Sequence, residues 1–415
     1  MNEASTPTAQ RSFAALRHPG YRGFFFSFAG AMMADSIEHV ISYWVIFQKF
    51  HSPALGGFAV VSHWVPFLLF SVYVGALADR YDPRRLIQLG MLLFMGVSIA
   101  WGVLFATDTL QMWHAMALLI MHGVAGVLWV APAQVLLHDL VSAEQLQSAV
   151  RLNATSRQLG LLMGPALGGG ILLLMGPTNG IFFNALLYVP TIVWLSKAPL
   201  KRRTPIAAAT RSGTIHHFLD IAATFRAIAN NRSLVAMILL AGGAALFIGN
   251  AYQAQMPGFA NDLGFGDADL AYSMLLGADA AGALTAGFVL ESRGLLQANP
   301  RTAFALAMLW CCALAGFALS QFYVLALVLL FAAGFVELSF NSMAQTLVQL
   351  HAPSSIRGRV LGLYSMVALG SRAFSGITVG LIGSIVGIHA ALAGSAMTLL
   401  ALCSLLFVFG GRRRS

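Results

Sequence analysis

The chain has 415 residues, of which 58% are hydrophobic and only 9% are charged. Soluble domains are about 45–50% apolar, so a soluble globule of this length would lack the polar surface to cover it. The net charge of +9 does not require nucleic acid as a partner, because basic membrane loops give the same excess. The composition therefore predicts an all-α membrane protein and excludes an ordinary soluble one.

Long apolar segments separated by short polar connections occupy most of the chain. A transmembrane helix needs roughly 20 apolar residues to cross the hydrocarbon core. The segments of about this length lie at residues 22–48, 54–78, 86–106, 112–138, 148–175, 178–196, 234–256, 269–290, 302–319, 322–350, 358–385 and 388–410. They predict twelve membrane-spanning helices.

The longest connection lies near the middle of the chain and divides the segments into two sets of six. It covers residues 197–233, begins KAPLKRRTP and is basic. We therefore expect a cytoplasmic linker here, between six-helix bundles at 22–196 and 234–410, with cytoplasmic tails at 1–21 and 411–415.

Basic residues fall almost entirely on one side of the predicted membrane. With a cytoplasmic N-terminus, 21 of the 24 Lys and Arg residues lie in cytoplasmic segments, only Lys49 lies outside, and two lie within spans. Cytoplasmic loops of membrane proteins carry such an excess. We expect both termini in the cytoplasm and a monomer in the plasma membrane, which is the inner membrane of a bacterial cell.

The two halves of the chain repeat one another. GALADRYDPRR from residue 75 matches GFVLESRG from residue 287 at an offset of 212, so that Asp79 corresponds to Glu291. AQVL at 133–136 matches AQTL at 344–347 at an offset of 211. Two matches at nearly one offset indicate a duplicated unit. Parallel six-span repeats with a site at the midplane between them are typical of secondary transporters.

GALADRYDPRR resembles the signature of the loop between the second and third helices of the major facilitator superfamily, G-x-L-x-D-R-x-G-R-R. Asp82 and Pro83 depart from it. The matching residues are Gly75, Asp79, Arg80, Arg84 and Arg85. The resemblance covers the whole chain and implies the major facilitator fold, with twelve helices in two pseudo-symmetric six-helix bundles and transport by alternating access.

A second motif, GLLMGPALGG, resembles the end of the fifth-helix antiporter signature of the same superfamily. Its matching residues are Gly160, Gly164, Pro165, Gly168 and Gly169. Arg151 stands where the signature has an earlier glycine. Glycines four apart also favour close helix packing in any membrane protein. The closest branch by resemblance is that of drug-efflux proteins and enterobactin exporters.

Asp79 lies at the predicted cytoplasmic end of the second span. The resemblance implies that this acid pairs with neighbouring arginines and with the N-terminus of the eleventh helix, where a carboxylate is favoured by the helix dipole. We expect a conformational latch formed by Asp79. For Arg80, Arg84 and Arg85 a role in topology alone is an equal alternative.

Acidic residues inside the predicted spans are candidates for proton coupling, because a charge there is costly. Asp35, Glu38 and His39 share one helical face, and Asp35 lies thirteen residues past Arg22, about 20 Å along a helix. Adjacent carboxylates beside an imidazole would leave one acid readily protonated. The alternative is a packing network in which His39 neutralises one acid.

The second predicted half contains two further acids within spans. Asp279 and Glu337 have no neighbour of opposite sign on their own helices, so each must find a partner across the bundle, face water or be protonated. We expect them to take part in proton coupling. Polar side chains near them predict a cavity lining at Asn341, Gln345, Asn250 and Gln253.

Two arginines, Arg157 and Arg372, also lie within predicted spans. Each would either pair with one of the acids or offer a bidentate fork to an anionic substrate. If Arg372 faces the cavity, the substrate would carry carboxylate, phenolate or phosphate oxygens.

Several histidines and methionines raise the possibility of metal transport. They are His63, His114, His122, His138, Met112 and Met116. Met and His suit Cu(I), but Met at helical spacing in a lipid-facing span is usually just hydrophobic. We expect no metal site. With no GxxxxGK[ST] motif and no nucleophile–base arrangement, we also expect no cofactor and no enzymatic activity.

The sequence thus predicts a secondary transporter that exports a small amphipathic compound, such as a drug or a siderophore-like metabolite, in exchange for protons. Protonation of Asp35 or Glu38, with Asp279 or Glu337, would compete with the substrate. One alternative is an uncoupled transporter, an importer or a lipid flippase on the same fold. An alternative of another class is a non-transporting membrane receptor or assembly partner.

Overall fold

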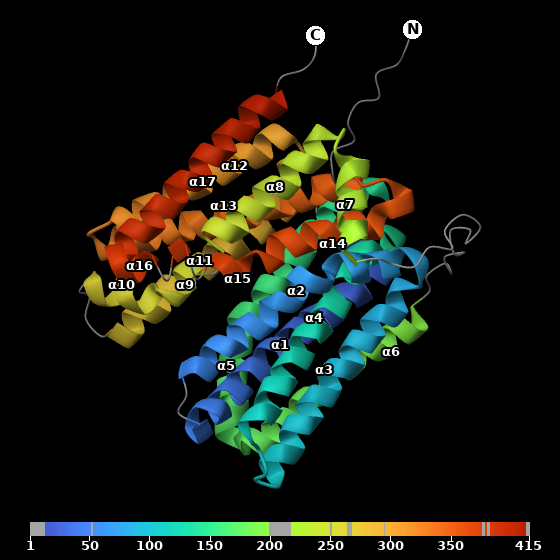
Figure 1. Cartoon of the computed structure of the whole chain (residues 1–415), viewed down its shortest axis with the longest axis vertical. Coiled ribbons are helices and arrows are strands. Elements are labelled where there is room, and N and C mark those ends of the chain that lie inside the picture. The colour runs from blue at the N-terminus through green and yellow to red at the C-terminus, as the bar shows by residue number, and fades with distance from the viewer. Residues whose placement is uncertain are drawn as a thin grey trace.

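A computed structural model of the chain describes residues 13–50, 53–198, 217–249, 251–263, 268–293, 295–375, 378–379 and 382–411. Across these ranges the regular structure is helical and contains no β-strand. Most of the expected N-terminal tail, the linker residues 199–216, Asn250 and the end of the C-terminal tail lie outside the described residues. The helices form two groups that lie side by side (Figure 1).

The first group comprises the helices from the N-terminus to Lys197. They are η1 (Ala15–Arg17), α1 (Pro19–Phe50), α2 (Pro53–Arg80), α3 (Pro83–Ala106), α4 (Met112–Leu140), η2 (Ala143–Gln145), α5 (Leu146–Leu186) and α6 (Val189–Lys197). Within α5 the chain turns at Gly176, where φ is +72°, a value that glycine adopts without strain. The predicted fifth and sixth spans therefore meet inside α5.

The second group contains the helices from His217 onward. They are α7 (His217–Ile228), α8 (Arg232–Phe247), α9 (Ala251–Ala254), α10 (Met256–Asp262), α11 (Ala268–Arg293), α12 (Pro300–Leu319), α13 (Tyr323–His351), η4 (Ser354–Ile356), α14 (Arg357–Ser365), η5 (Met366–Gly370), α15 (Arg372–Ser375), α16 (Ile382–Val386) and α17 (Ile388–Gly411).

Three of the expected apolar segments are not single helices, and the one at 178–196 is shared between the end of α5 and α6. The segment at 234–256 is interrupted after α8, where Gly249 has a φ of +49°. The segment at 358–385 is divided among four short helices, and one of them, η5, is π-helical. Such π-helical turns are short, because the wider turn disturbs the regular hydrogen-bond ladder, and they are frequent at functional sites.

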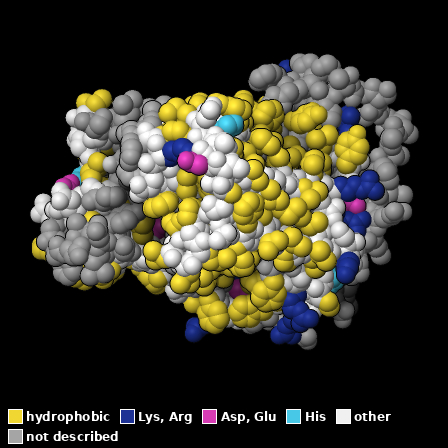
Figure 2. Space-filling model, turned by 90° about the horizontal axis from the view of Figure 1, so that it is seen from below, with side chains coloured by type: hydrophobic (Ala, Val, Ile, Leu, Met, Phe, Trp, Pro, Cys, Tyr) yellow, Lys and Arg dark blue, Asp and Glu magenta, His cyan; other side chains and the backbone are white. Residues whose placement is uncertain are grey.

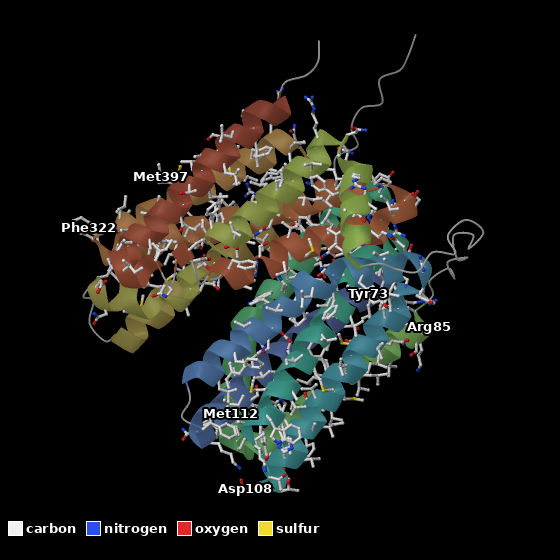
Figure 3. The ribbon with its side chains drawn as sticks, in the orientation of Figure 1. Tyr73, Arg85, Asp108, Met112, Phe322 and Met397 are labelled. Carbon is white, nitrogen blue, oxygen red and sulfur yellow. The ribbon has the colours of Figure 1, made fainter. Side chains whose placement is uncertain are left out.

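Eight helical segments among the described residues are long and apolar enough to cross a membrane. Large apolar side chains are exposed on the outside, with Leu174 at 89% and Phe322 at 73% of full exposure. Hydrophobic side chains spread over much of the face in Figure 2, and Phe322 and Met397 point away from the helices in Figure 3. A soluble monomer rarely exposes so continuous an apolar surface, so this surface faces lipid. The count of twelve spans stays a prediction.

Charged residues cluster at the two ends of the first group. Arg85 and Asp108 lie at opposite ends of α3 (Figure 3). Asp82 is the N-cap of α3 and accepts a hydrogen bond from the backbone N–H of Arg84 at 3.0 Å. Burial alone would raise the pKa of the Asp82 carboxyl. The hydrogen bonds from Arg84 and its positive charge outweigh this effect, so the pKa lies below its ordinary value. At the far end, Lys49 Nζ donates to Asp108 Oδ1 at 2.5 Å.

Glycines bring α1 and α5 into close contact. A Cβ atom on Gly160 or Gly164 would overlap the side chain of Met32 or Ser36, respectively, on α1. A Cβ on Gly168 would come within 3.1 Å of Val40 Cβ. Gly169 faces open space instead, and the side chain of Pro165 lies outside the described part. The glycine stripe therefore lies at a helix–helix interface.

The two groups touch through α2 and α4 packed on α14, and through α5 packed on α11 and α13. Near the first described residue, the ring of Phe13 packs against Phe288 on α11. Near the last, Phe407 on α17 packs against Phe304 on α12. The groups enclose a cavity further along the helices. The limits of the two bundles stay a prediction.

Candidate functional site

A cavity of about 120 Å³ lies between the two groups of helices. Its wall is aromatic on the side of the first group and carries amides and hydroxyls on the other side. The charged residues that line it are Asp35, Arg157 and Arg372. The predicted lining residues Asn341 and Gln345 also reach it, whereas Gln253 does not line it.

A buried histidine joins the two acids of α1. His122 on α4 places Nε2 2.8 Å from Asp35 Oδ1 and Nδ1 2.7 Å from Glu38 Oε1. Each contact needs a proton between nitrogen and oxygen, and a neutral imidazole carries only one. The three groups, which we call the proton network, therefore hold one additional proton, on His122 or on one of the acids. The Ser98 hydroxyl also donates to Glu38.

The sequence pattern suggested His39, one turn from Asp35, as the neutralising histidine. In the structure His39 Nδ1 lies 2.8 Å from the backbone oxygen of Asp35 and 3.9 Å from its carboxylate. His122 was considered only as a metal ligand, because the sequence does not reveal which helices face one another. The signal that could have found it is a lone histidine in the middle of an apolar span.

Three histidines gather beside the proton network. His39, His63 and His122 offer ring nitrogens within 4.8 Å of one another, which is close enough to surround a metal ion. Both nitrogens of His122 already contact carboxylates, so a metal would have to displace one of these contacts. We therefore interpret the cluster as a site for protons.

A tyrosine bridges the two acids of the second group. Tyr252 Oη lies 3.0 Å from Asp279 Oδ2 and 3.2 Å from Glu337 Oε2. One hydroxyl proton can serve only one of these contacts. If the Tyr252 hydroxyl donates to one of the two acids, the contact with the other acid is favourable when that acid is protonated and donates to the tyrosine oxygen. Gln253 also donates to Asp279 at 3.2 Å, so this predicted residue belongs to the tyrosine-bridged pair. The tyrosine was not anticipated.

Neither buried arginine has a hydrogen-bond partner for its Nε among the described residues. Arg157 comes from α5 and Arg372 from the start of α15. The Arg372 guanidinium lies 5.3 Å from the ring centre of Trp64, a cation–π contact. Glu337 attracts both arginines through space. Among the described residues, neither arginine forms an ion pair with Asp35, Glu38, Asp279 or Glu337, although such pairing was one of the two expectations.

Asp79 lies against the first turn of α14. Its carboxylate oxygens accept from the backbone N–H groups of Gly358 at 2.6 Å and Arg359 at 3.0 Å. A Cβ on Gly75 would overlap the carbonyl oxygen of Gly358, so glycine is needed for this approach. Arg84 instead forms its ion pair with Asp82, at 2.6 Å. We call the contact of Asp79 with α14 the Asp79 latch.

The repeat of the chain creates a second contact of the same kind. Glu291, the counterpart of Asp79, ends α11 and accepts from the Ser148 hydroxyl in the first turn of α5. Arg151 donates to the backbone oxygens of Leu290 and Leu296, each at 2.7 Å. Sequence reasoning noted Glu291 only as a repeat match and Arg151 only as a departure from a motif. Both belong to this contact, which we call the Glu291 latch.

A family model described as transmembrane secretion effector, within the major facilitator superfamily, matches residues 10–412. The enterobactin exporter EntS of Shigella boydii serotype 4 (strain Sb227) is 25% identical over 404 residues, which cover 94% of this chain and 92% of that relative.

Solved structures of transporters share the fold. The fucose:proton symporter FucP of E. coli matches with a TM-score of 0.73 at 10% identity, over 95% of this chain and 100% of that chain. A bacterial homologue of the iron transporter ferroportin, in an outward-facing state, matches with a TM-score of 0.72 at 15% identity, over 95% and 100%. At such identities the likeness shows the fold alone.

Proposed function

Because the chain belongs to the transmembrane secretion effector family of the major facilitator superfamily, we propose that it exports a small amphipathic compound in exchange for protons. Membership makes it a membrane transporter and not an enzyme. Its relationship to an exporter supports export as the direction. The observation that carries proton coupling is the proton network, in which His122 contacts two buried carboxylates and Asp35 also lines the cavity.

Protons bind to and leave the network from the cavity. Asp35 lines that cavity, while Glu38 is only 2% exposed, contacts His122 and accepts a hydrogen bond from the Ser98 hydroxyl. Asp35 is therefore the acid that exchanges protons with water, and Glu38 positions His122 from the buried side of the network. The tyrosine-bridged pair, Asp279 and Glu337, is a second place for a proton in the other half.

The two latches supply the conformational part of the mechanism. Both close the end of the molecule that we expect in the cytoplasm, given the positive-inside rule. Protonation and substrate binding would favour opposite-facing states of the two halves, as alternating access requires. We propose that the closed latches hold an outward-facing state and that their opening admits substrate from the cytoplasm.

The cell setting follows from the same features. The apolar outer surface and the family support a location in a membrane, and we propose a monomer in the plasma membrane. The excess of basic residues on one side supports cytoplasmic termini. A drug or a siderophore-like metabolite suits the cavity, which combines aromatic rings with a few polar groups, as ligand pockets usually do.

The test uses a bacterial host that lacks its main efflux pumps. Wild type and the double variant Asp35→Asn, Glu38→Gln are expressed at equal membrane levels, and accumulation of dyes, antibiotics and siderophores is measured with and without an uncoupler. We expect wild type to lower accumulation of at least one compound, and both the uncoupler and the double variant to abolish this effect.

The matched control makes the same chemical changes at two exposed acids outside the helices that line the cavity, as Asp108→Asn, Glu144→Gln. It should transport like wild type. Undiminished proton-driven export by the Asp35→Asn, Glu38→Gln variant would falsify the proposed coupling. Export that ignores an imposed pH gradient would identify an uncoupled transporter, accumulation that rises would identify an importer, and movement of fluorescent lipids alone would identify a flippase.

A further inference from the structure

We propose that the transported compound is an organic anion with an aromatic body, and that Arg157 and Arg372 bind its carboxylate or phenolate oxygens. The inference rests on the proposed function, since it takes the cavity as the transport site. It names the chemical class of substrate that this cavity selects.

Two cavity-lining arginines without a hydrogen-bond acceptor for their Nε–H among the described residues carry the inference. Arg157 and Arg372 both line the cavity, and the buried Nε–H of each lacks an acceptor among the described residues. A buried charge is normally paired and hydrogen-bonded, because removal from water is costly. Because both side chains line the cavity, their guanidinium groups, which match carboxylate geometry, can reach a molecule bound there.

The charge of the cavity wall favours an anion over a cation. Of the three charged residues that line it, two are arginines and one is Asp35. One oxygen of the Asp35 carboxylate already contacts His122 at 2.8 Å, so Asp35 has less capacity to bind a cationic compound. A cation would therefore be repelled by two guanidinium groups, whereas an anion would supply acceptors for their N–H donors.

The aromatic part of the ligand follows from the side chains beside the arginines. Arg372 lies over the ring of Trp64 at 5.3 Å, and the same wall carries Phe67, Phe94 and Trp129. Aromatic rings prefer offset or edge-to-face contacts with one another. A planar ring bearing an acidic oxygen could therefore pack against this wall while the oxygen reaches the guanidinium groups.

The residues proposed to bind protons differ from those proposed to bind the anion. The proton network belongs to α1 and α4, whereas the two arginines come from α5 and α15. Binding of the anion can thus be measured apart from proton coupling, on purified protein without a gradient.

The experiment is isothermal titration calorimetry of the full-length protein in detergent, with 1-naphthoate, 1-naphthamide and 1-naphthylmethylammonium as probes of one shape and three charges. We expect wild type to bind 1-naphthoate at least about tenfold more tightly than either other probe, as a charge-assisted hydrogen bond allows. Arg157→Gln and Arg372→Gln should each remove most of this preference, and Arg372→Lys should keep part of it.

The control is Arg301→Gln, at an exposed arginine on α12, which should leave the preference unchanged. Thermal unfolding of each variant shows whether it is folded, and the comparison of probes on wild type needs no variant. Equal binding of the three probes, preference for the cation, or no binding of the anion by folded wild type would overturn the inference. Failure of proton coupling with anion preference intact would reject the export mechanism alone.

Discussion

At the scale of single residues, His122 is the side chain on which the proposed mechanism depends. It is 3% exposed and contacts two carboxylates on a neighbouring helix. Either acid without it would be a buried charge lacking its main partner. The same residue therefore contributes to stability and, in the proposed mechanism, to proton exchange, and the two roles can be separated by substitution.

His122→Asn should destabilise the protein by about 3–5 kcal/mol, the range for removing one partner of a buried ionic contact. The amide can donate to one acid but carries no positive charge. Adding Glu38→Gln should recover part of the loss, because the second substitution removes the unpaired charge. The measurement is the thermal unfolding midpoint in detergent, with the single and double variants compared. Additive losses would contradict a direct coupling between the two residues.

At the scale of helices, the packing of α1 on α5 depends on a stripe of glycines. Gly160, Gly164 and Gly168 each lie against a side chain or backbone of α1. In a lipid environment such close approach supplies much of the association between helices. The acids that we propose as proton carriers, Asp35 and Glu38, belong to α1, so this packing also positions them.

Gly164→Ala should destabilise the protein by about 1–3 kcal/mol, as overpacking does, because the added Cβ would overlap Ser36. Gly169→Ala, on the same helix, is the matched control. No atom lies within 4 Å of its added Cβ, so it should be neutral or stabilising by up to about 1 kcal/mol. The measurement is the thermal unfolding midpoint of the two variants, which shows whether the added Cβ atom is costly only where α1 and α5 are in contact. Equal effects would mean that the stripe does not govern the packing.

At the scale of the whole molecule, the duplication places equivalent acids at equivalent contacts. Asp79 ends α2 and meets the start of α14, while Glu291 ends α11 and meets the start of α5. Each latch joins a helix of one half to a helix of the other. If this end faces the cytoplasm, as we propose, opening it requires both contacts to separate, and each contributes to the balance between the facing states.

Asp79→Asn should weaken its latch by about 1–2 kcal/mol, the upper range for a carboxylate at a helix N-terminus, and raise the cytoplasm-open population about 5–30-fold. Adding Glu291→Gln should raise it further. Distances between spin labels on the two halves, or labelling of cysteines introduced in the cavity, would report this population. Asp82→Asn is the control, since Asp82 is the N-cap of α3 and forms its contacts within the first group of helices. A population that stays constant in the double variant would rule out the latches as a conformational device.

The sequence by itself determined the class of protein and identified several residues that line the cavity. Apolar segments, basic asymmetry and the repeat predicted a helical membrane transporter, because each depends only on composition and on order along the chain. Residues that share a helix face, such as Asp35 and Glu38, were also accessible in this way, since helical spacing is periodic.

Only the tertiary structure decided which residues meet across helices. The partners His122, Tyr252 and Ser148 come from elements distant in sequence, and spacing along one helix carries no information about the helix opposite. The interruption of the predicted spans at 234–256 and 358–385 was likewise hidden, because apolar composition does not reveal where packing breaks a helix. Contacts between elements, rather than propensities within them, decide the chemistry of this cavity.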